Sequence, residues 1–299
     1  MARIFVIANP VAARTTDSLI ATVLRTIEAA GWSVDWAKTA SPGDARRLAS
    51  LAVASGVDVV GVLGGDGTTM QAAAGLVGTG VKLGLLPGGT GNVLAGNLRI
   101  PVGPIQAAEL VCRGRSRRID LGRLERDGET HYFGVACSAG VGARVMGETA
   151  SRDKRRLGIG GYFQTLFRVV PTIRSSAFRV TVDGRCQEIA ASEVLILNCR
   201  EIIPPIPVHP AASLDDGVLD VMALAADSPW QVARGMGRAF ANVLLEASAT
   251  DYLHYARGRE VVVEADQVQL VQFDGDPAGT TPLTTVICPG AIDVVAPLS

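Results

Sequence analysis

The 299-residue chain is poor in the residues on which several classes of protein depend. Its five cysteines are odd in number and form no CxxC pair, which argues against a disulfide framework or a zinc site and for a reducing compartment. The three histidines lie far apart and show no metal-binding spacing. Lysine and arginine total 28 against 29 aspartate and glutamate, so the net charge of −1 provides no overall basic field for nucleic acid.

Long apolar runs are missing as well. No run reaches the roughly 18 apolar residues that a membrane-spanning helix needs, and the N-terminus lacks a secretory layout. The hydrolase motif G-x-S-x-G is also absent. A content of 48% hydrophobic and 19% charged residues suits a folded globular protein. We therefore expect a cytoplasmic protein, and its length favours two domains over one.

Glycine is abundant, and two glycine-rich segments each follow a strand-like run. Val57 to Leu63 is apolar and β-branched, and GGDGT at 64–68 joins it to an alanine-rich helical segment. VKLGLL at 81–86 leads in the same way into PGGTGN at 87–92. Glycine allows a close backbone approach, and free N–H groups at a helix start can hold phosphate oxygens. Two such turns at neighbouring parallel strands predict a ligand site.

The first loop is neither a P-loop nor a G-x-G-x-x-G fingerprint. Asp66 would repel a phosphate unless a cation or water intervened, which favours a metal-bound phosphate. The structural alternative is a glycine-rich turn in which Asp66 is a cap. Thr68 either caps the helix or donates its hydroxyl to a phosphate.

The first 118 residues alternate between strand-like and helix-like segments, as in a doubly wound parallel sheet. Ser41 is the expected N-cap of the second helix, with Pro42 in its first turn. The expected strands are 3–8, 32–39, 57–63 and 81–86, and the expected helices begin near residues 18, 42, 69 and 93.

Between residues 119 and 289 the chain consists of short alternating segments with Asp-Gly turns, which predicts an antiparallel, β-sandwich-like domain. The last strand, at about 290–299, is expected to return to the first domain. Two interruptions look helical. Residues 152–170 carry a basic cluster and then aromatic residues, which suits either a membrane-surface segment or a helix packed on the sandwich. The second interruption begins at Ser228.

The order of GGDGT and PGGTGN resembles the catalytic domain of diacylglycerol kinases and their bacterial lipid-kinase relatives, a group that includes sphingosine and ceramide kinases. NAD kinases and phosphofructokinases share a GGDG-type loop more distantly. The resemblance covers nearly the whole chain. It implies an ATP- and Mg²⁺-dependent enzyme that phosphorylates a lipid hydroxyl, with diacylglycerol as the first expectation. Such an enzyme would meet its lipid substrate peripherally at the membrane surface, without nucleic acid; whether it forms a homodimer is open.

The resemblance also implies nucleotide contacts at strand ends and in both glycine loops. The expected set is Asn9, Thr39, Gly64, Gly65, Asp66, Gly67, Thr68, Gly89, Thr90 and Asn92. For Thr39 the alternative is a hydroxyl that finishes a strand end. The glycines that the family places after its Asn-Pro pair are absent from Val11 to Thr16, which leaves that part of the nucleotide pocket open.

For the catalytic residues, FDGDP at 273–277 corresponds to the family's D-G-E turn, whose glutamate is taken as the base that activates the acceptor hydroxyl. The base here would be Asp276, whose reach is about 1.5 Å shorter. Asp274 would position a metal or the acceptor, and Asp66 completes the expected catalytic set. The alternative is a plain Asp-Gly hairpin.

A second acidic turn, SLDDGVLD at 213–220, resembles the segment in which bacterial members hold a structural Mg²⁺. The implied ligands are the carboxylate of Asp216 and the carbonyls of Ser213 and Val218, with waters completing the shell. A hairpin without metal is the alternative.

Two other functions stay open at this point. One is NAD kinase-like phosphorylation of a soluble acceptor. The other is a catalytically inactive nucleotide- or lipid-binding protein, suggested by the missing glycines and the shortened Asp276. If the chain is a kinase, we expect the active site in a cleft between the domains, with Asp66 on one wall and Asp276 on the other.

Overall fold

The structure is a computed structural model. It describes residues 1–126, 128–143, 175–203, 206–207, 212–225 and 253–297. The segment at 152–170 and the helix expected from Ser228 lie outside the described residues. The chain forms two compact units, one of Met1–Leu121, Ile203–Pro205 and Pro289–Ser299, the other of Gly122–Ile202 and Ile206–Cys288. Among the described residues, no helix is long and apolar enough to cross a membrane.

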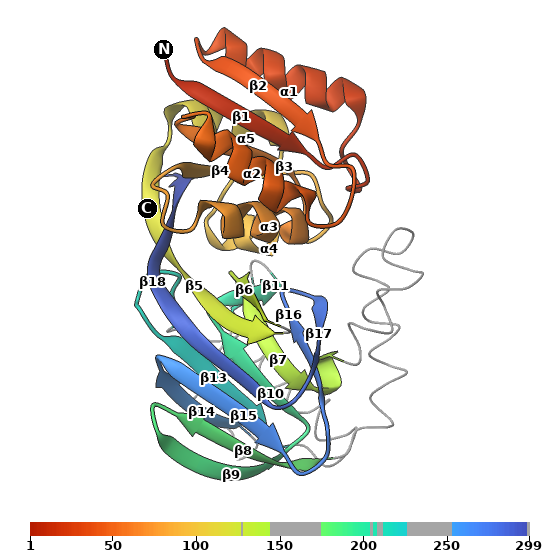
Figure 1. Cartoon of the computed structure of the whole chain (residues 1–299), viewed down its shortest axis with the longest axis vertical. Helices are drawn as coiled ribbons and strands as arrows, with labels where there is room; N and C mark the ends of the chain where they lie inside the picture. The colour runs from red at the N-terminus through yellow and green to blue at the C-terminus, as the bar shows by residue number, and fades with distance from the viewer. Residues whose placement is uncertain (127, 144–174, 204–205, 208–211, 226–252, 298–299) are drawn as a thin grey trace. The chain divides into compact units, whose positions relative to one another are not determined.

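The first unit contains a parallel sheet in the order β2-β1-β3-β4, with helices packed on it (Figure 1). Helix α1 packs with α5, and α2 packs with α3. The elements are β1 Arg3–Ala8, α1 Asp17–Ala29, β2 Ser33–Lys38, α2 Asp44–Ala54, β3 Val59–Gly64, α3 Asp66–Leu76, β4 Lys82–Pro87, α4 Val93–Asn97 and α5 Pro104–Arg113.

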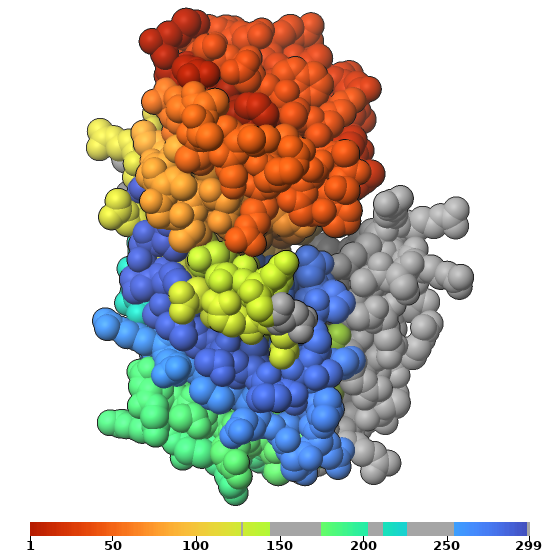
Figure 2. Space-filling view, viewed as in Figure 1, coloured from red at the N-terminus to blue at the C-terminus, as the bar shows by residue number. Residues whose placement is uncertain are grey.

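Strand β3 is the centre of this sheet, and all six of its residues are buried. It pairs with β1 on one side and β4 on the other, so both edges are hydrogen-bonded. In the space-filling view of Figure 2, the red to orange atoms of the first unit form a closely packed surface on the side shown. Burial on both faces explains why this strand reads as a continuous apolar run rather than an alternating one.

The second unit is a sandwich of antiparallel strands. One sheet has the order β14-β13-β10-β7-β16-β17, and the other layer contains β18-β15-β8-β9 with β5 and β6. Apolar side chains from both layers form a single core that includes Phe133, Phe178, Ile196 and Val261. The α/β fold followed by an antiparallel sandwich-like part is therefore confirmed.

The remaining strands run from β5 to β18. From Pro289 onward β18 belongs to the first unit, where Val294 pairs with Leu83 of β4. The bounds are β5 Arg115–Arg126, β6 Glu129–Phe133, β7 Ala136–Gly140, β8 Ser176–Val182, β9 Arg185–Ala191, β10 Glu193–Leu197, β11 Glu201–Ile203, β12 Ile206–Pro207, β13 Leu219–Leu224, β14 Leu253–Gly258, β15 Glu260–Ala265, β16 Leu270–Phe273, β17 Asp276–Thr280 and β18 Leu283–Ala296.

Two helix starts differ from the prediction. The N-cap of α2 is Gly43 rather than Ser41, because the chain turns there in the left-handed region with φ of 86°. Helix α3 begins at Asp66, three residues before the expected start, with Gly65 as its N-cap. Thr68 therefore lies inside the first turn and is not the cap.

Candidate active site

The four parallel strands of the first unit end level with one another. Ala8, the last residue of β1, is opposite Lys38 of β2 and Leu63 of β3, and Leu63 is opposite Leu86 of β4. The predicted nucleotide contacts follow directly after these positions, so the sheet register brings them to one edge. That edge is the carboxyl end of the strands, where open α/β sheets bind ligands.

The two glycine loops contact each other through their backbones. The carbonyl of Gly64 accepts hydrogen bonds from the N–H groups of Gly88 at 2.8 Å and Gly89 at 3.1 Å. A Cβ atom on Gly89 would lie 2.5 Å from the Cα of Gly65, closer than carbon atoms can approach. Any side chain at Gly89 would therefore separate the loops.

Helix α3 starts at this edge with Asp66, Gly67 and Thr68. Its N-cap, Gly65, makes no side-chain capping bond. The first N–H groups of an α-helix have no partner within the helix, and they favour anions. The start of α3 is thus suited to phosphate oxygens.

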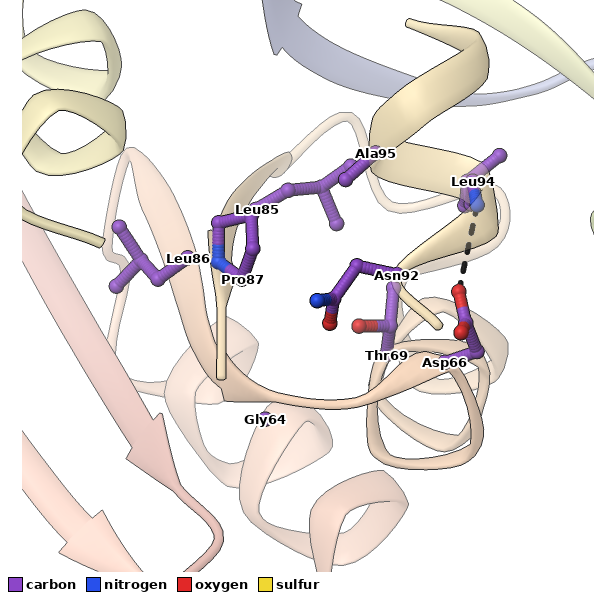
Figure 3. A pocket seen from close by; sticks show the side chains of 9 residues that line it. All are labelled: Gly64, Asp66, Thr69, Leu85, Leu86, Pro87, Asn92, Leu94 and Ala95. Atoms are coloured by element: carbon purple, nitrogen blue, oxygen red, sulfur yellow. Dashed lines mark hydrogen bonds between the residues drawn. The ribbon is translucent and has the colours of Figure 1, made fainter. Parts of the chain in front are cut away.

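Asp66 connects this helix to the second glycine loop. Its Oδ1 accepts a hydrogen bond from the N–H of Leu94 in α4 at 3.3 Å (Figure 3). Burial raises the pKa of Asp66, and the N–H groups of Leu94, Val93 and Asn92 oppose that rise. The structural alternative, a capping role, is therefore part of what Asp66 does, although the helix that it caps is α4.

A small cavity lies behind the loops, between the ends of β3 and β4 and the start of α4. Its volume of about 10 Å³ is room for no more than about one water molecule, so it is not the place for a nucleotide. The lining residues are Gly64, Asp66, Thr69, Leu85, Leu86, Pro87, Asn92, Leu94 and Ala95 (Figure 3).

The predicted polar contacts also hold the loops in shape. Asn9 donates from Nδ2 to the hydroxyl of Thr68 at 2.7 Å. The Asn92 amide closes its own loop, accepting from the N–H of Gly89 at 3.0 Å and donating to the Gly89 carbonyl at 2.8 Å. Thr39 continues the β1–β2 ladder through its N–H, which donates to Ala8, and Thr90 is exposed.

In the second unit, Asp274 and Gly275 form the tight turn between β16 and β17, with φ of 47° and 86°. The carboxylate of Asp274 accepts three backbone N–H groups from residues 134–136, at 2.7, 2.9 and 2.9 Å. Asp274 therefore fixes the turn against the segment before β7. Its predicted role at a metal or the acceptor stays a prediction.

Two residues that the sequence analysis did not single out hold the same hairpin. Arg126 donates to three carbonyls, those of Ala278 at 2.9 Å, Pro282 at 3.3 Å and Thr280. Gln272, a buried amide in an otherwise apolar strand, accepts the N–H of Gly275 at 2.8 Å. Asp276 then begins β17 and is exposed. A polar residue directly before the F-D-G-D turn was the available signal for Gln272.

In the second acidic turn, the carboxylate of Asp216 is paired with an arginine side chain. Oδ2 of Asp216 contacts the guanidinium of Arg257, and Oδ1 accepts the N–H of Val218 at 3.2 Å. Arg257 also contacts Asp220, which is 1% exposed, at 2.9 Å. Both carboxylate oxygens of Asp216 therefore have a partner in the protein, and one of these partners is a positively charged group. Ser213 uses its hydroxyl to contact Asp215 at 2.6 Å. The metal set of Ser213, Asp216 and Val218 stays a prediction.

No three histidine, cysteine, aspartate or glutamate side chains form a metal-binding group within the part of the chain that the structure describes.

Comparison with known families accounts for both halves of the chain. Residues 3–124 match the diacylglycerol kinase catalytic domain, and residues 135–296 match the YegS C-terminal NAD kinase beta sandwich-like domain. The chain belongs to the diacylglycerol kinase family. It is thus a member of a kinase family, a group of phosphotransferases, and the two glycine loops lie in the catalytic-domain match.

Relatives of this chain have different names. A "Diacylglycerol kinase" of Mycobacterium tuberculosis (strain CDC 1551 / Oshkosh) is 33% identical over 85% of this chain and 82% of its own length. A "Probable lipid kinase YegS-like" of Xanthomonas axonopodis pv. citri (strain 306) is 31% identical over 75% of this chain and 74% of its own length. A solved structure from Bacillus anthracis str. Sterne shares the fold, with a TM-score of 0.83 and 23% identity, and the match covers 98% of this chain and 96% of that one.

Proposed function

We propose that this family member transfers phosphate from ATP to the hydroxyl of a diacylglycerol-like lipid. The observation that carries the proposal is the pair of glycine loops in backbone contact at the carboxyl edge of the parallel sheet. The lipid acceptor is supported by the names of the relatives, a diacylglycerol kinase and a probable lipid kinase. Because such lipids reside in bilayers, the enzyme would act at a membrane surface as a peripheral cytoplasmic protein.

The first unit would hold the nucleotide. The N–H groups that open α3 and those of the second glycine loop would receive its phosphates, and the residues at the strand ends would contact the rest of it. Bound Mg²⁺–ATP supplies the transferable phosphoryl group with its charge neutralised. Asp66, as the carboxylate between the loops, is the side chain that would hold the cation. The full proposed set is Asn9, Thr39, Gly64, Gly65, Asp66, Gly67, Thr68, Gly89, Thr90 and Asn92.

Asp276 is the proposed base. As the lipid oxygen bonds to the γ-phosphorus, its proton passes to the carboxylate of Asp276, and the bond from the γ-phosphorus to the bridging oxygen breaks to release ADP. Arg126, Gln272 and Asp274 support this assignment because they hold the hairpin on which Asp276 lies. A fixed turn matters more for aspartate than for glutamate, since the shorter side chain has less freedom to adjust.

The test is phosphate transfer from labelled ATP with Mg²⁺ to a panel of acceptors. Detergent micelles would carry diacylglycerol, ceramide or a sphingoid base, and NAD would be offered separately in solution. Labelling of a lipid, with diacylglycerol strongest, is the expected result. Labelling of NAD alone would indicate that the enzyme phosphorylates a soluble acceptor and not a lipid. ATP binding without any labelled product would indicate a binding protein.

A further inference from the structure

A second group of polar residues lies behind the Asp274–Asp276 turn, on the sheet face opposite the apolar core of the second unit. Ser138 of β7 is paired directly with Gln272 of β16, and Glu193 of β10 is paired with Gly140 of β7. Ser138 is 1% exposed and Gln272 is 7% exposed. Buried polar side chains persist when they are hydrogen-bonded to one another.

The hydrogen bonds run in one direction. A backbone N–H can only donate, so the N–H of Gly275 fixes Oε1 of Gln272 as the acceptor at 2.8 Å. The Nε2 group of Gln272 must then donate, and it meets the hydroxyl oxygen of Ser138 at 3.0 Å. The remaining Ser138 proton is directed to the carboxylate of Glu193, with which Ser138 is hydrogen-bonded.

Two glycines, Gly140 and Gly142, lie next to the Glu193 carboxylate. The N–H of Gly142 donates to Oε2 at 2.7 Å. A Cβ on Gly142 would lie 2.5 Å from Oε1, and one on Gly140 would lie 2.9 Å from Oε2. A side chain at Gly142 would push the carboxylate away. Glycine at position 140 is required mainly by its backbone, because φ is 126° and a Cβ would lie 2.4 Å from the carbonyl oxygen of Ser192.

We propose that Glu193 is a positioning residue for the Asp274–Asp276 turn, acting through Ser138 and Gln272 on the N–H of Gly275. The ionised carboxylate terminates the chain of donors, so every hydrogen bond between Glu193 and the turn has a fixed direction. The relevance of these hydrogen bonds to catalysis rests on the proposed function. Their existence and direction do not depend on it.

Protonation of Glu193 near neutral pH should change the hydrogen bond at the backbone N–H of Gly275. Burial raises the pKa of Glu193 to about 7, against the opposing hydrogen bonds from Ser138 and Gly142. The flanking strands place Gly140 and Leu224 opposite Glu193, neither of which is titratable. Cys137 on β7 feels the Glu193 charge, but burial raises the pKa of its thiol far above neutral, so it stays uncharged.

The experiment is a pH titration of the ¹⁵N-labelled full chain by NMR, following the backbone amide of Gly275 between pH 5 and 9. In the wild type its chemical shift should change with a midpoint near 7. Both Glu193→Gln and Ser138→Ala should abolish that midpoint, and combining them should have no further effect. Glu188→Gln, on an exposed glutamate of β9, should leave it unchanged.

His131 is the necessary control, because its ring lies 5.4 Å from that of Phe273 and histidine side chains in general change charge between pH 5 and 8. His131→Asn should preserve the Gly275 midpoint. A midpoint that persists in Ser138→Ala, or disappears with His131→Asn, would overturn the proposal.

Activity provides a separate readout. If lipid is phosphorylated, Glu193→Gln should remove one transition near pH 7 from the kcat profile and change KM little. If no acceptor is phosphorylated, the NMR titration still decides whether Glu193 controls the turn, so the two failures can be told apart.

Discussion

The two Asp-Gly turns of the second unit, at 216–217 and 274–275, use the same dipeptide to hold a carboxylate in different ways. Asp216 contacts the guanidinium of Arg257, a side chain 41 positions away. Asp274 instead accepts three backbone N–H groups from residues 134–136. The comparison shows that an Asp-Gly motif specifies a turn but leaves the partner of its carboxylate to the rest of the fold.

Arg257→Met should have the largest effect on stability. It leaves the buried carboxylate of Asp220 without its guanidinium, which we expect to lower the free energy of unfolding by about 3 kcal/mol, since Arg257 is 38% exposed and water would offset part of the loss. Urea unfolding measures the change. Arg259→Met, on an exposed neighbour, is the matched control, and equal effects of the two substitutions would refute the role given to Arg257.

Asp274→Asn should have the second-largest effect on stability. An amide offers one acceptor oxygen where three N–H groups converge, and its own N–H₂ group would face one of the donors. We expect a loss of about 2 kcal/mol in the free energy of unfolding. The comparison is Asp276→Asn in the same turn, which should destabilise less because Asp276 is exposed. The reverse order would contradict the account of this turn.

Glu193 should make stability depend on pH. Its pKa in the folded state is about 7, above the ordinary value of 4.5, so between these values the folded state binds the extra proton. Its stabilising contribution is complete below about pH 4.5 and is lost as pH rises through about 7. In Glu193→Gln, the free energy of unfolding should therefore change less with pH between 4.5 and 7 than in the wild type. If the two curves run parallel over this range, Glu193 is not the titrating group.

Mg²⁺ should have the smallest effect. Without nucleotide, we expect the melting temperature of the wild type to be the same in Mg²⁺ and in EDTA, because Arg257 already neutralises Asp216. In Arg257→Met the cation can take that place and should raise the melting temperature. A wild type that is stabilised by Mg²⁺ and loses this response in Asp216→Asn would support the predicted metal site and contradict the role given to Arg257.

The main helices and strands could be predicted from the sequence because they depend on local patterns. The apolar run before GGDGT and the alternation after residue 119 predicted the parallel and antiparallel parts. The partners of the charged groups could not be predicted in this way. Asp66 meets Leu94, Asp216 meets Arg257 and Gln272 meets Ser138, separations of 28, 41 and 134 residues that only the sheet register brings together.

Helix starts were missed for a related reason. Gly43 takes over the N-cap position of α2 through its left-handed backbone, although Ser41 has the better capping side chain. Asp66 enters α3 early because its carboxylate contacts the start of α4. In both places a tertiary arrangement overrides a local preference.

The most direct test of the central claim is a series at position 276, measured as phosphate transfer from ATP to diacylglycerol in micelles. The account predicts that Asp276→Asn lowers kcat by at least about 100-fold, as expected for loss of a general base, while ATP binding is retained. Asp276→Glu, which restores the family's residue, should stay active. Lipid phosphorylation by Asp276→Asn at the wild-type rate would contradict the assignment of the base.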